Sequence, residues 1–145
     1  MERIVGIDYG KKRTGVAVSD PLGIFANAIE TVPSGDIVRY LKNYTQKETI
    51  VRFVVGYPMN LNNTPSEGAK YVDQFLNLLK KHFSEIPVTL EDERYTSSMA
   101  FQTMIDGGVK MMDRRDKSMV DKISAAIILQ SYLDRKAIEK KREVK

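Results

Sequence analysis

The chain has 145 residues, of which 42% are hydrophobic and 29% charged, and its 23 lysines and arginines against 19 aspartates and glutamates give a formal net charge of +4. This length and composition fit one folded domain with its own core and exclude a low-complexity chain. There is no cysteine and His82 is the single histidine, which excludes disulfide frameworks, thiolate catalysis and multi-histidine metal sites. No apolar run approaches the ~20 residues of a membrane span, so we expect a cytoplasmic protein without a membrane partner.

The first half of the chain predicts three strands and a helix. Residues 3–8 and 14–19 are short apolar runs of strand-forming residues, joined by a basic turn at residues 11–13, which is typical of a hairpin. Residues 24–31 can supply a third strand. Asp36 then stands at the N-cap position of a helix whose apolar residues recur at helical spacing.

The second half predicts strands and helices in alternation. Residues 50–56 are apolar on nearly every position, as in a central strand covered on both faces. Thr64-Pro65-Ser66-Glu67 resembles a capped helix start, before an apolar repeat that ends at Phe83. The remaining elements are expected at residues 87–91 (a strand), 96–106 (a helix ended by Gly107-Gly108) and 118–135 (an amphipathic helix that frays into a basic tail, 136–145). The order β-β-β-α-β-α-β-α predicts a single α/β domain over residues 1–145 with a mixed sheet.

The first acidic candidate is Asp8, in the segment Gly6-Ile7-Asp8-Tyr9-Gly10. It stands at the carboxyl end of a buried strand, which is the edge where α/β proteins place their ligands. The flanking glycines allow a phosphate or another backbone to come close. A turn aspartate that merely caps the hairpin is the alternative interpretation.

The second candidate is the cluster Glu91-Asp92-Glu93-Arg94, at the end of the predicted fifth strand. Strand alternation places Asp92 on the opposite face from Glu91 and Glu93, so only part of the cluster can join Asp8. Glu93 is favoured over Asp92 for its reach. A charged strand end that is simply solvated is the alternative.

The third candidate is Asp121, near the start of the last predicted helix. Ser124, Ala125 and Ile128 share its helix face, which predicts that this face packs closely on the sheet and that the carboxylate points to the sheet edge. The pattern Ser118-x-x-Asp121 is also a capping box, which is the structural alternative.

Acidic residues at three separate places, without histidine or cysteine, favour a hard cation with oxygen ligands, Mg²⁺ or Mn²⁺. Two such ions ~3.5–4 Å apart can activate a water and stabilise the leaving oxygen in phosphodiester hydrolysis. The candidate catalytic residues are Asp8, Glu93 and Asp121, and the candidate metal ligands are Asp8, Asp92, Glu93 and Asp121. Basic residues that flank these sites favour a nucleic acid as the partner. They are Lys11, Lys12, Arg13, Arg94, Arg114, Arg115, Lys117 and Lys122.

Four segments resemble the YqgF family, also called RuvX: GIDYGKKRTGVAVSD, VVGYPMNLNNT, DERYTSSMA and DKISAAIILQSYL. They follow one another in order across nearly the whole chain. The resemblance implies a ribonuclease H-like fold, a mixed five-stranded sheet with helices on both faces. It also implies a metal-dependent nuclease that uses two Mg²⁺ or Mn²⁺ ions with substrate bound. By motif position the family's acids fall on Asp8, on Asp92-Glu93 and on Asp121, and its arginine falls on Arg94.

The resemblance leaves the substrate open. Structured RNA at the 5′ end of pre-16S rRNA, free or in ribosomal particles, is favoured, and four-way DNA in a Holliday junction resolvase reaction is the alternative. We expect a monomer or weak homodimer, with residues 135–145 as a solvated basic helix end. From other classes, an actin-like ATP-binding module or a non-catalytic nucleic-acid-binding domain would also explain Asp8-x-Gly10 followed by a hairpin, although 145 residues leave room for only one ATPase lobe.

Overall fold

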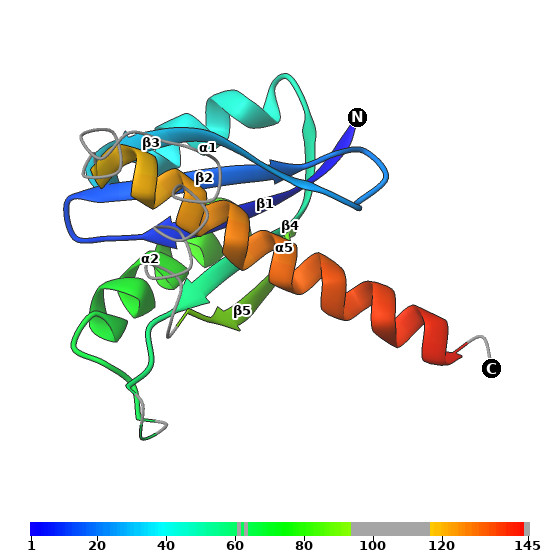
Figure 1. Cartoon of the computed structure of the whole chain (residues 1–145). Helices are drawn as coiled ribbons and strands as arrows, with labels where there is room; N and C mark the ends of the chain where they lie inside the picture. Colours follow the sequence, from blue (N-terminus) through cyan, green and yellow to red (C-terminus); the bar gives the residue numbers. More distant parts are fainter. Residues whose placement is uncertain (61, 63, 94–116, 144–145) are drawn as a thin grey trace.

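The computed structural model describes residues 1–60, 62, 64–93 and 117–143 (Figure 1). The strands are β1 (Glu2–Tyr9), β2 (Arg13–Ser19), β3 (Ala26–Pro33), β4 (Thr49–Tyr57) and β5 (Val88–Asp92). The helices are the short 3₁₀ helix η1 (Ser34–Asp36) and the α-helices α1 (Ile37–Thr45), α2 (Ala69–His82) and α5 (Lys117–Glu143). None of the helices in the described ranges is long and apolar enough to cross a membrane.

The strands form one mixed sheet in the order β3-β2-β1-β4-β5. β1 pairs antiparallel with β2 and parallel with β4, β2 pairs antiparallel with β3, and β4 pairs parallel with β5. The predicted α/β class and mixed five-stranded sheet are therefore confirmed. Because β1, β4 and β5 run in the same direction, their carboxyl ends meet at one edge of the sheet, which is where the predicted acidic residues of β1 and β5 stand.

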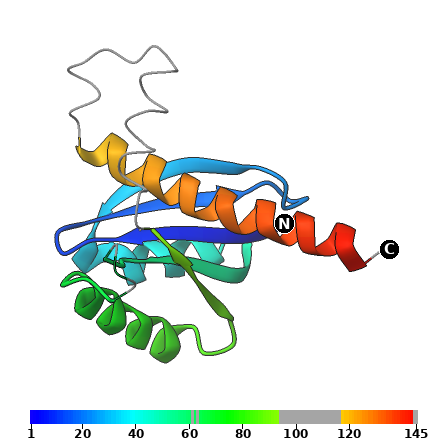
Figure 2. The same cartoon turned by 60° about the horizontal axis from the view of Figure 1, so that its bottom comes forward.

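Helices cover both faces of the sheet, which gives three layers (Figure 2). α1 and α2 bury one face around large side chains such as Ile7, Phe53 and Phe75. α5 lies across the other face, where the core is built from smaller residues of the sheet, such as Ala17, and from Ala125 and Leu129 of the helix. The central strands β1 and β4 are thus covered above and below, which explains their nearly unbroken apolar sequence.

Glycines in the strands allow α5 to lie directly on the sheet backbone. A Cβ atom on Gly15 would overlap the carbonyl oxygen of Asp121, and one on Gly6 would lie 2.6 Å from the Cβ of Leu129. The close approach places the first turns of α5 over β1 and β2 near the end of β1. Asp121 is positioned by this packing.

The structure differs from the sequence prediction at three element ends. α2 begins at Ala69 with Gly68 as its N-cap, so the capped start predicted at Thr64 is wrong; the Thr64 hydroxyl donates to Asn62 instead. α5 continues to Glu143 and does not fray at residue 136. Ser118 lies inside α5 and does not cap it. The helix predicted at 96–106 lies outside the described residues.

Candidate active site

Asp8 and Glu93 come together across the intervening strand β4. Asp8 faces α5, because its neighbour Tyr9 points the other way and stacks on Phe75 of α2 at 4.5 Å between ring centroids. Glu93 directly follows β5, and its Oε2 lies 2.6 Å from where a Cβ of Gly56 would stand. The absence of a side chain on Gly56 lets Glu93 reach over β4 until its carboxyl group forms a hydrogen bond with that of Asp8.

The pKa values of both carboxyl groups are raised. Burial raises the pKa of Glu93 to about 10, and the charge of Asp8 and the hydrogen bond to it act in the same direction. Burial also raises the pKa of Asp8, against the effect of the hydrogen bond, and the nearby charge of Asp121 raises it further. Carboxyl pairs held together in this way are typical of functional sites, since a bound cation can replace the proton.

Asp121 is the third acid on this face of the sheet. Its backbone lies over Gly15, which is the β2 partner of Asp8 in the sheet register. Its Oδ2 accepts a hydrogen bond from Nε of Arg13, the first residue of β2, at 2.9 Å. In the described part of the chain no group of three or more acidic, histidine or cysteine side chains is arranged to hold a metal ion. The Asp121 carboxylate is held by Arg13, whereas the carboxyl groups of Asp8 and Glu93 form a hydrogen bond with each other.

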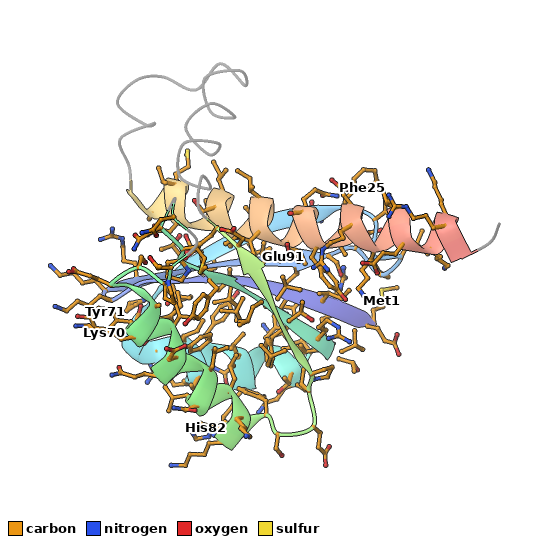
Figure 3. The ribbon with its side chains drawn as sticks, turned by 90° about the horizontal axis from the view of Figure 1, so that it is seen from below. Met1, Phe25, Lys70, Tyr71, His82 and Glu91 are labelled. Atoms are coloured by element: carbon orange, nitrogen blue, oxygen red, sulfur yellow. The ribbon has the colours of Figure 1, made fainter. Side chains whose placement is uncertain are left out.

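The acidic cluster at the end of β5 divides as alternation predicts. Asp92 is exposed, whereas Glu91 is 8% exposed and lies against α5 (Figure 3). The Glu91 carboxylate forms an ion pair with Arg135 and accepts a hydrogen bond from Ser131 at 3.4 Å. Glu91 therefore anchors α5, and Glu93 is the member of the cluster that joins Asp8.

The structure places four of the eight predicted basic residues. Lys11 and Lys12 are exposed in the turn after β1, Arg13 begins β2, and Lys122 is partly buried on α5 beside Asp121. Arg94, Arg114 and Arg115 lie outside the described residues, as does the side chain of Lys117. The four that are placed lie around the acids of the site.

Two features of the site are not predicted from the sequence. Lys11 and Lys70 place their Nζ atoms 5.7 Å and 5.2 Å from the ring centroid of Tyr71 on α2, which adds an aromatic residue to the basic turn. Ser34 donates a hydrogen bond to the carbonyl oxygen of Gly10 at 2.6 Å and thereby holds this turn in place. Both depend on contacts between distant parts of the chain, and only the basic-aromatic dipeptide Lys70-Tyr71 is visible as a sequence signal.

The residues present fit a hard divalent cation. The donors are carboxylate oxygens, which Mg²⁺ and Mn²⁺ prefer. Ser124, one helical turn after Asp121 on the side of α5 that faces the sheet, is 1% exposed, and its Oγ has no hydrogen-bond partner among the described residues. An unsatisfied buried hydroxyl in this position is consistent with a site that is completed by an ion and its water ligands.

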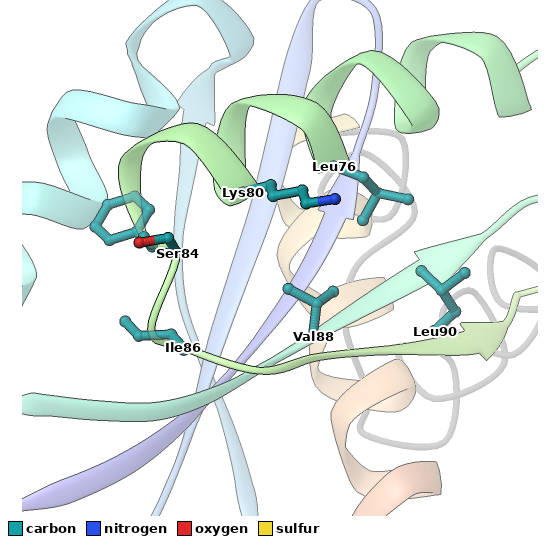
Figure 4. Close-up of a pocket in the computed structure, with 7 residues that line it drawn as sticks. Leu76, Lys80, Ser84, Ile86, Val88 and Leu90 are labelled. Carbon is teal, nitrogen blue, oxygen red and sulfur yellow. The ribbon is translucent and has the colours of Figure 1, made fainter.

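A separate hollow of about 300 Å³ lies between α2 and β5 (Figure 4). It is on the opposite face of the sheet from Glu93. Its lining is mostly apolar and contains no acidic residue: Leu76, Lys80, Phe83, Ser84, Ile86, Val88 and Leu90. This composition does not suit metal chemistry, so the acidic site and the hollow are distinct features.

The strand order, the helix across one face and the acids at the ends of β1 and β5 define a ribonuclease H-like protein. Two solved structures share this fold over nearly the whole chain. Thermus thermophilus RuvC in complex with a Holliday junction substrate has a TM-score of 0.57 at 17% identity, with 93% of this chain and 96% of that one covered. The fowlpox virus resolvase in complex with Holliday junction DNA also has a TM-score of 0.57, at 9% identity, with 92% and 97% covered.

The sequence comparisons identify the family. A family model described as "RuvX: Holliday junction resolvase" matches residues 2–135. A protein of Parabacteroides distasonis is 52% identical over 136 residues, covering 94% of this chain and 97% of its own, and one of Phocaeicola vulgatus is 51% identical over 136 residues, covering 94% and 98%. Both carry the name "Putative pre-16S rRNA nuclease". The chain belongs to the RuvX family of nucleases, which confirms the resemblance found in its motifs.

Proposed function

We propose that this protein is a divalent-metal-dependent nuclease that hydrolyses phosphodiester bonds in the 5′-end maturation of pre-16S rRNA. The observation that carries the proposal is the contact between the carboxyl groups of Asp8 and Glu93, with Asp121 on the same face of the sheet. The names of the relatives, which are about half identical over nearly the whole chain, support the choice of pre-16S rRNA as substrate. The precursor would be bound either free or in ribosomal particles.

Asp8, Glu93 and Asp121 would hold Mg²⁺ or Mn²⁺, and two ions are expected once substrate is bound. A bound ion supplies an activated water and stabilises the leaving oxygen of the phosphodiester. Because burial raises the pKa values of Asp8 and Glu93, binding of an ion would be coupled to release of a proton from the pair. We assign Glu93 rather than Asp92 as a ligand because Glu93 contacts Asp8, whereas Asp92 is exposed.

The chain's basic residues would hold the nucleic-acid backbone beside these acids. Lys11 and Lys12 in the β1–β2 turn and Arg13 at the start of β2 form one continuous cationic segment that begins three residues after Asp8, and Lys122 follows Asp121 on α5. Phosphate contacts of this kind fix the position of a nucleic acid without reading its sequence. Arg94, Arg114, Arg115 and Lys117 are proposed for the same role from the sequence alone.

The decisive experiment is a cleavage assay on the purified protein with Mg²⁺ or Mn²⁺, with an RNA spanning the 5′ end of 16S rRNA as substrate. Asp8→Asn is expected to abolish cleavage, and Glu93→Gln to reduce it by about 10²-fold or more, the scale of a lost catalytic electrostatic contact. Asp92→Asn is the matched control, one residue away on the exposed face, and is expected to change the rate less than about threefold. Full cleavage by Asp8→Asn would refute the metal-nuclease proposal, and equal losses in the two β5 variants would refute the assignment of Glu93.

A second candidate substrate is four-way DNA, which the description of the matching family model favours. The phosphate chemistry is the same for both substrates, so the same assay with a DNA junction of equal total phosphate decides between them. Preferred cleavage of the RNA supports the rRNA function. Preferred cleavage of the junction with symmetrically placed nicks would replace it with junction resolution.

An ATP-binding role is tested in parallel by thermal denaturation with Mg²⁺-ATP, Mn²⁺ or the RNA. The nuclease proposal expects no ATP-dependent stabilisation beyond that of other polyanions. A saturable shift with Mg²⁺-ATP that is lost in Asp8→Asn but kept in Asp121→Asn would favour the ATPase alternative, because nucleotide binding has no need of a carboxylate on α5.

A further inference from the structure

Arg13 and Asp121 form an ion pair that joins the β1–β2 hairpin to α5 inside the acidic site. The guanidinium Nε donates to Oδ2 of Asp121 at 2.9 Å, and the two side chains remain 40% and 22% exposed. Asp121 thus has a cationic partner from the protein itself, whereas Asp8 and Glu93 are bonded to each other. The third acid is therefore held by a side chain of β2, whereas the other two are held by each other.

The backbones on both sides of this pair are held in place. The carbonyl oxygen of Arg13 accepts a hydrogen bond from the N–H of Gly10 at 2.9 Å, which closes the turn. The backbone of Asp121 rests on Gly15, where no Cβ could be accommodated. A change of partner for either residue therefore needs only rotation of its own side chain.

A phosphodiester is the partner that Arg13 would prefer to a single carboxylate oxygen. A guanidinium can bind two phosphate oxygens at once, whereas in the ion pair only Nε contacts Oδ2. Lys11 and Lys12 extend the positive charge from Arg13 into the exposed turn, where a nucleic-acid backbone would approach. The bound phosphate would then lie within reach of the Arg13 side chain.

We propose that Arg13 is a positioning residue that couples substrate binding to metal binding. In the free protein Arg13 holds the Asp121 carboxylate in an ion pair. When a substrate phosphate binds the Arg13 guanidinium instead, Asp121 is released and can bind the metal ion together with Asp8 and Glu93. This inference rests on the proposed metal-nuclease function. It predicts that Arg13 competes with the cation for Asp121 in the free protein and ceases to compete when nucleic acid is bound. A purely structural ion pair would instead contribute modestly to stability and leave metal affinity independent of substrate.

The test is isothermal titration of Mn²⁺ into the full-length protein, with and without a short nuclease-resistant phosphorothioate oligonucleotide. Four proteins are compared: the unaltered chain, Arg13→Gln, Arg13→Lys and Lys140→Gln. Lys140→Gln is the control for charge, since it removes one positive charge near the far end of α5, away from the residues proposed to bind substrate. Arg13→Lys keeps the charge but lacks the guanidinium that contacts Asp121.

Without oligonucleotide, Arg13→Gln is expected to bind Mn²⁺ about two- to fivefold more tightly than the unaltered chain, the fold-change that matches a partly exposed ion pair. Arg13→Lys should show part of this gain although its net charge is unchanged, and Lys140→Gln should stay within about twofold of the unaltered chain. With oligonucleotide, the Mn²⁺ affinity of the unaltered chain and of Lys140→Gln should rise, whereas that of Arg13→Gln should not. Binding of Mn²⁺ by the oligonucleotide itself is subtracted with Asp8→Asn.

The outcomes separate this inference from the function on which it rests. If Asp8→Asn binds Mn²⁺ as tightly as the unaltered chain, the metal site itself is refuted and the inference with it. If Asp8→Asn loses binding but neither Arg13 variant gains it, or if the oligonucleotide tightens Mn²⁺ binding equally in Arg13→Gln and Lys140→Gln, the metal site stands and the role of Arg13 is overturned. Thermal denaturation establishes that each variant is folded. If Arg13→Gln does not fold, the Mn²⁺ affinity of Arg13→Lys is compared with that of the unaltered chain instead.

Discussion

At the scale of single residues, the unusual feature is a pair of buried carboxyl groups, those of Asp8 and Glu93, that contact each other. Such a pair lowers the free energy of unfolding, because each carboxyl group loses hydration and two negative charges at this distance repel each other. In this protein the shared hydrogen bond and a retained proton reduce that cost. Residues arranged at the expense of stability are expected where function requires them.

The stability of the protein without bound metal should fall as the pH rises, because the pKa of Glu93 is raised in the folded state. Its pKa is raised from 4.5 to about 10 in the folded state, so the folded chain holds a proton that the unfolded chain releases. Its stabilising contribution is complete below about pH 4.5 and is lost as pH rises toward 10, at up to about 1.4 kcal/mol per pH unit. Glu93→Gln removes this dependence. The melting temperature of Glu93→Gln minus that of the unaltered chain, both measured in EDTA, should therefore increase from pH 5 to pH 9.

The control for this measurement is Glu85→Gln, which changes an exposed glutamate in the turn before β5. Its melting curve should follow that of the unaltered chain at every pH. A difference between Glu93→Gln and the unaltered chain that does not vary with pH would contradict the shared proton. Addition of Mn²⁺ should stabilise the unaltered chain more than Glu93→Gln, because the ion replaces the proton on an intact pair.

At the scale of elements, the position of α5 decides whether the third acid reaches the site. The helix is amphipathic in sequence, and the buried residues Ser124, Ala125 and Ile128 confirm that the predicted face packs on the sheet. How closely it packs depends on glycines in other elements. The approach of helix to sheet is therefore a property of both surfaces together.

Gly15→Ala should displace α5 and destabilise the protein. The new Cβ would overlap the backbone carbonyl of Asp121, and a backbone contact cannot be relieved by rotating a side chain. We expect a loss of at least about 2 kcal/mol, and a melting temperature lower by about 5 °C or more. Gly35→Ala is the control, since a Cβ there meets nothing within 4 Å. Equal melting temperatures of the two variants would show that α5 does not rest on Gly15.

A second element-scale prediction concerns the end of α5. Arg135 was expected in a solvated tail, but it forms an ion pair with the buried Glu91, so that expectation is wrong for this residue. Truncation after Asp134 should therefore destabilise the protein by about 1–2 kcal/mol, because it leaves a buried carboxylate without its cation. Truncation after Lys136 keeps the ion pair and is expected to have little effect. Melting temperatures of the two truncated proteins test this, and a harmless truncation after Asp134 would contradict the anchoring role of Glu91.

At the scale of the whole molecule, the site and the end of α5 are far apart. The β1–β2 turn lies at one end of the sheet and the last turns of α5 project beyond the other (Figure 1). Both ends carry lysines, so net charge alone does not show which end binds nucleic acid. The acids of the site make the β1–β2 end the expected one.

The salt dependence of nucleic-acid binding should show which end of the molecule contacts the nucleic acid. Lys11→Gln with Lys12→Gln is expected to reduce the slope of log affinity against log salt by about two, if both residues contact phosphates. The control, Lys140→Gln with Lys141→Gln, removes the same charge from the far end of α5 and should leave the slope nearly unchanged. Fluorescence anisotropy with a labelled RNA at several salt concentrations measures both. A larger change of the slope in the control would show that the nucleic acid binds at the other end of the molecule.

The sequence by itself determined the order of the elements that the structure describes, the fold class and the family, because hydrophobic periodicity and motif order are local properties of the chain. It also placed Glu91 and Glu93 on one face of β5, since alternation follows directly from strand geometry. Tertiary structure decided what these acids contact. Glu93 reaches Asp8 because Gly56 has no side chain and leaves room above β4, and Glu91 forms an ion pair with Arg135. The pairing of Arg13 with Asp121, 108 residues later, likewise arises only when α5 packs on β2, since no local pattern specifies a contact between distant segments.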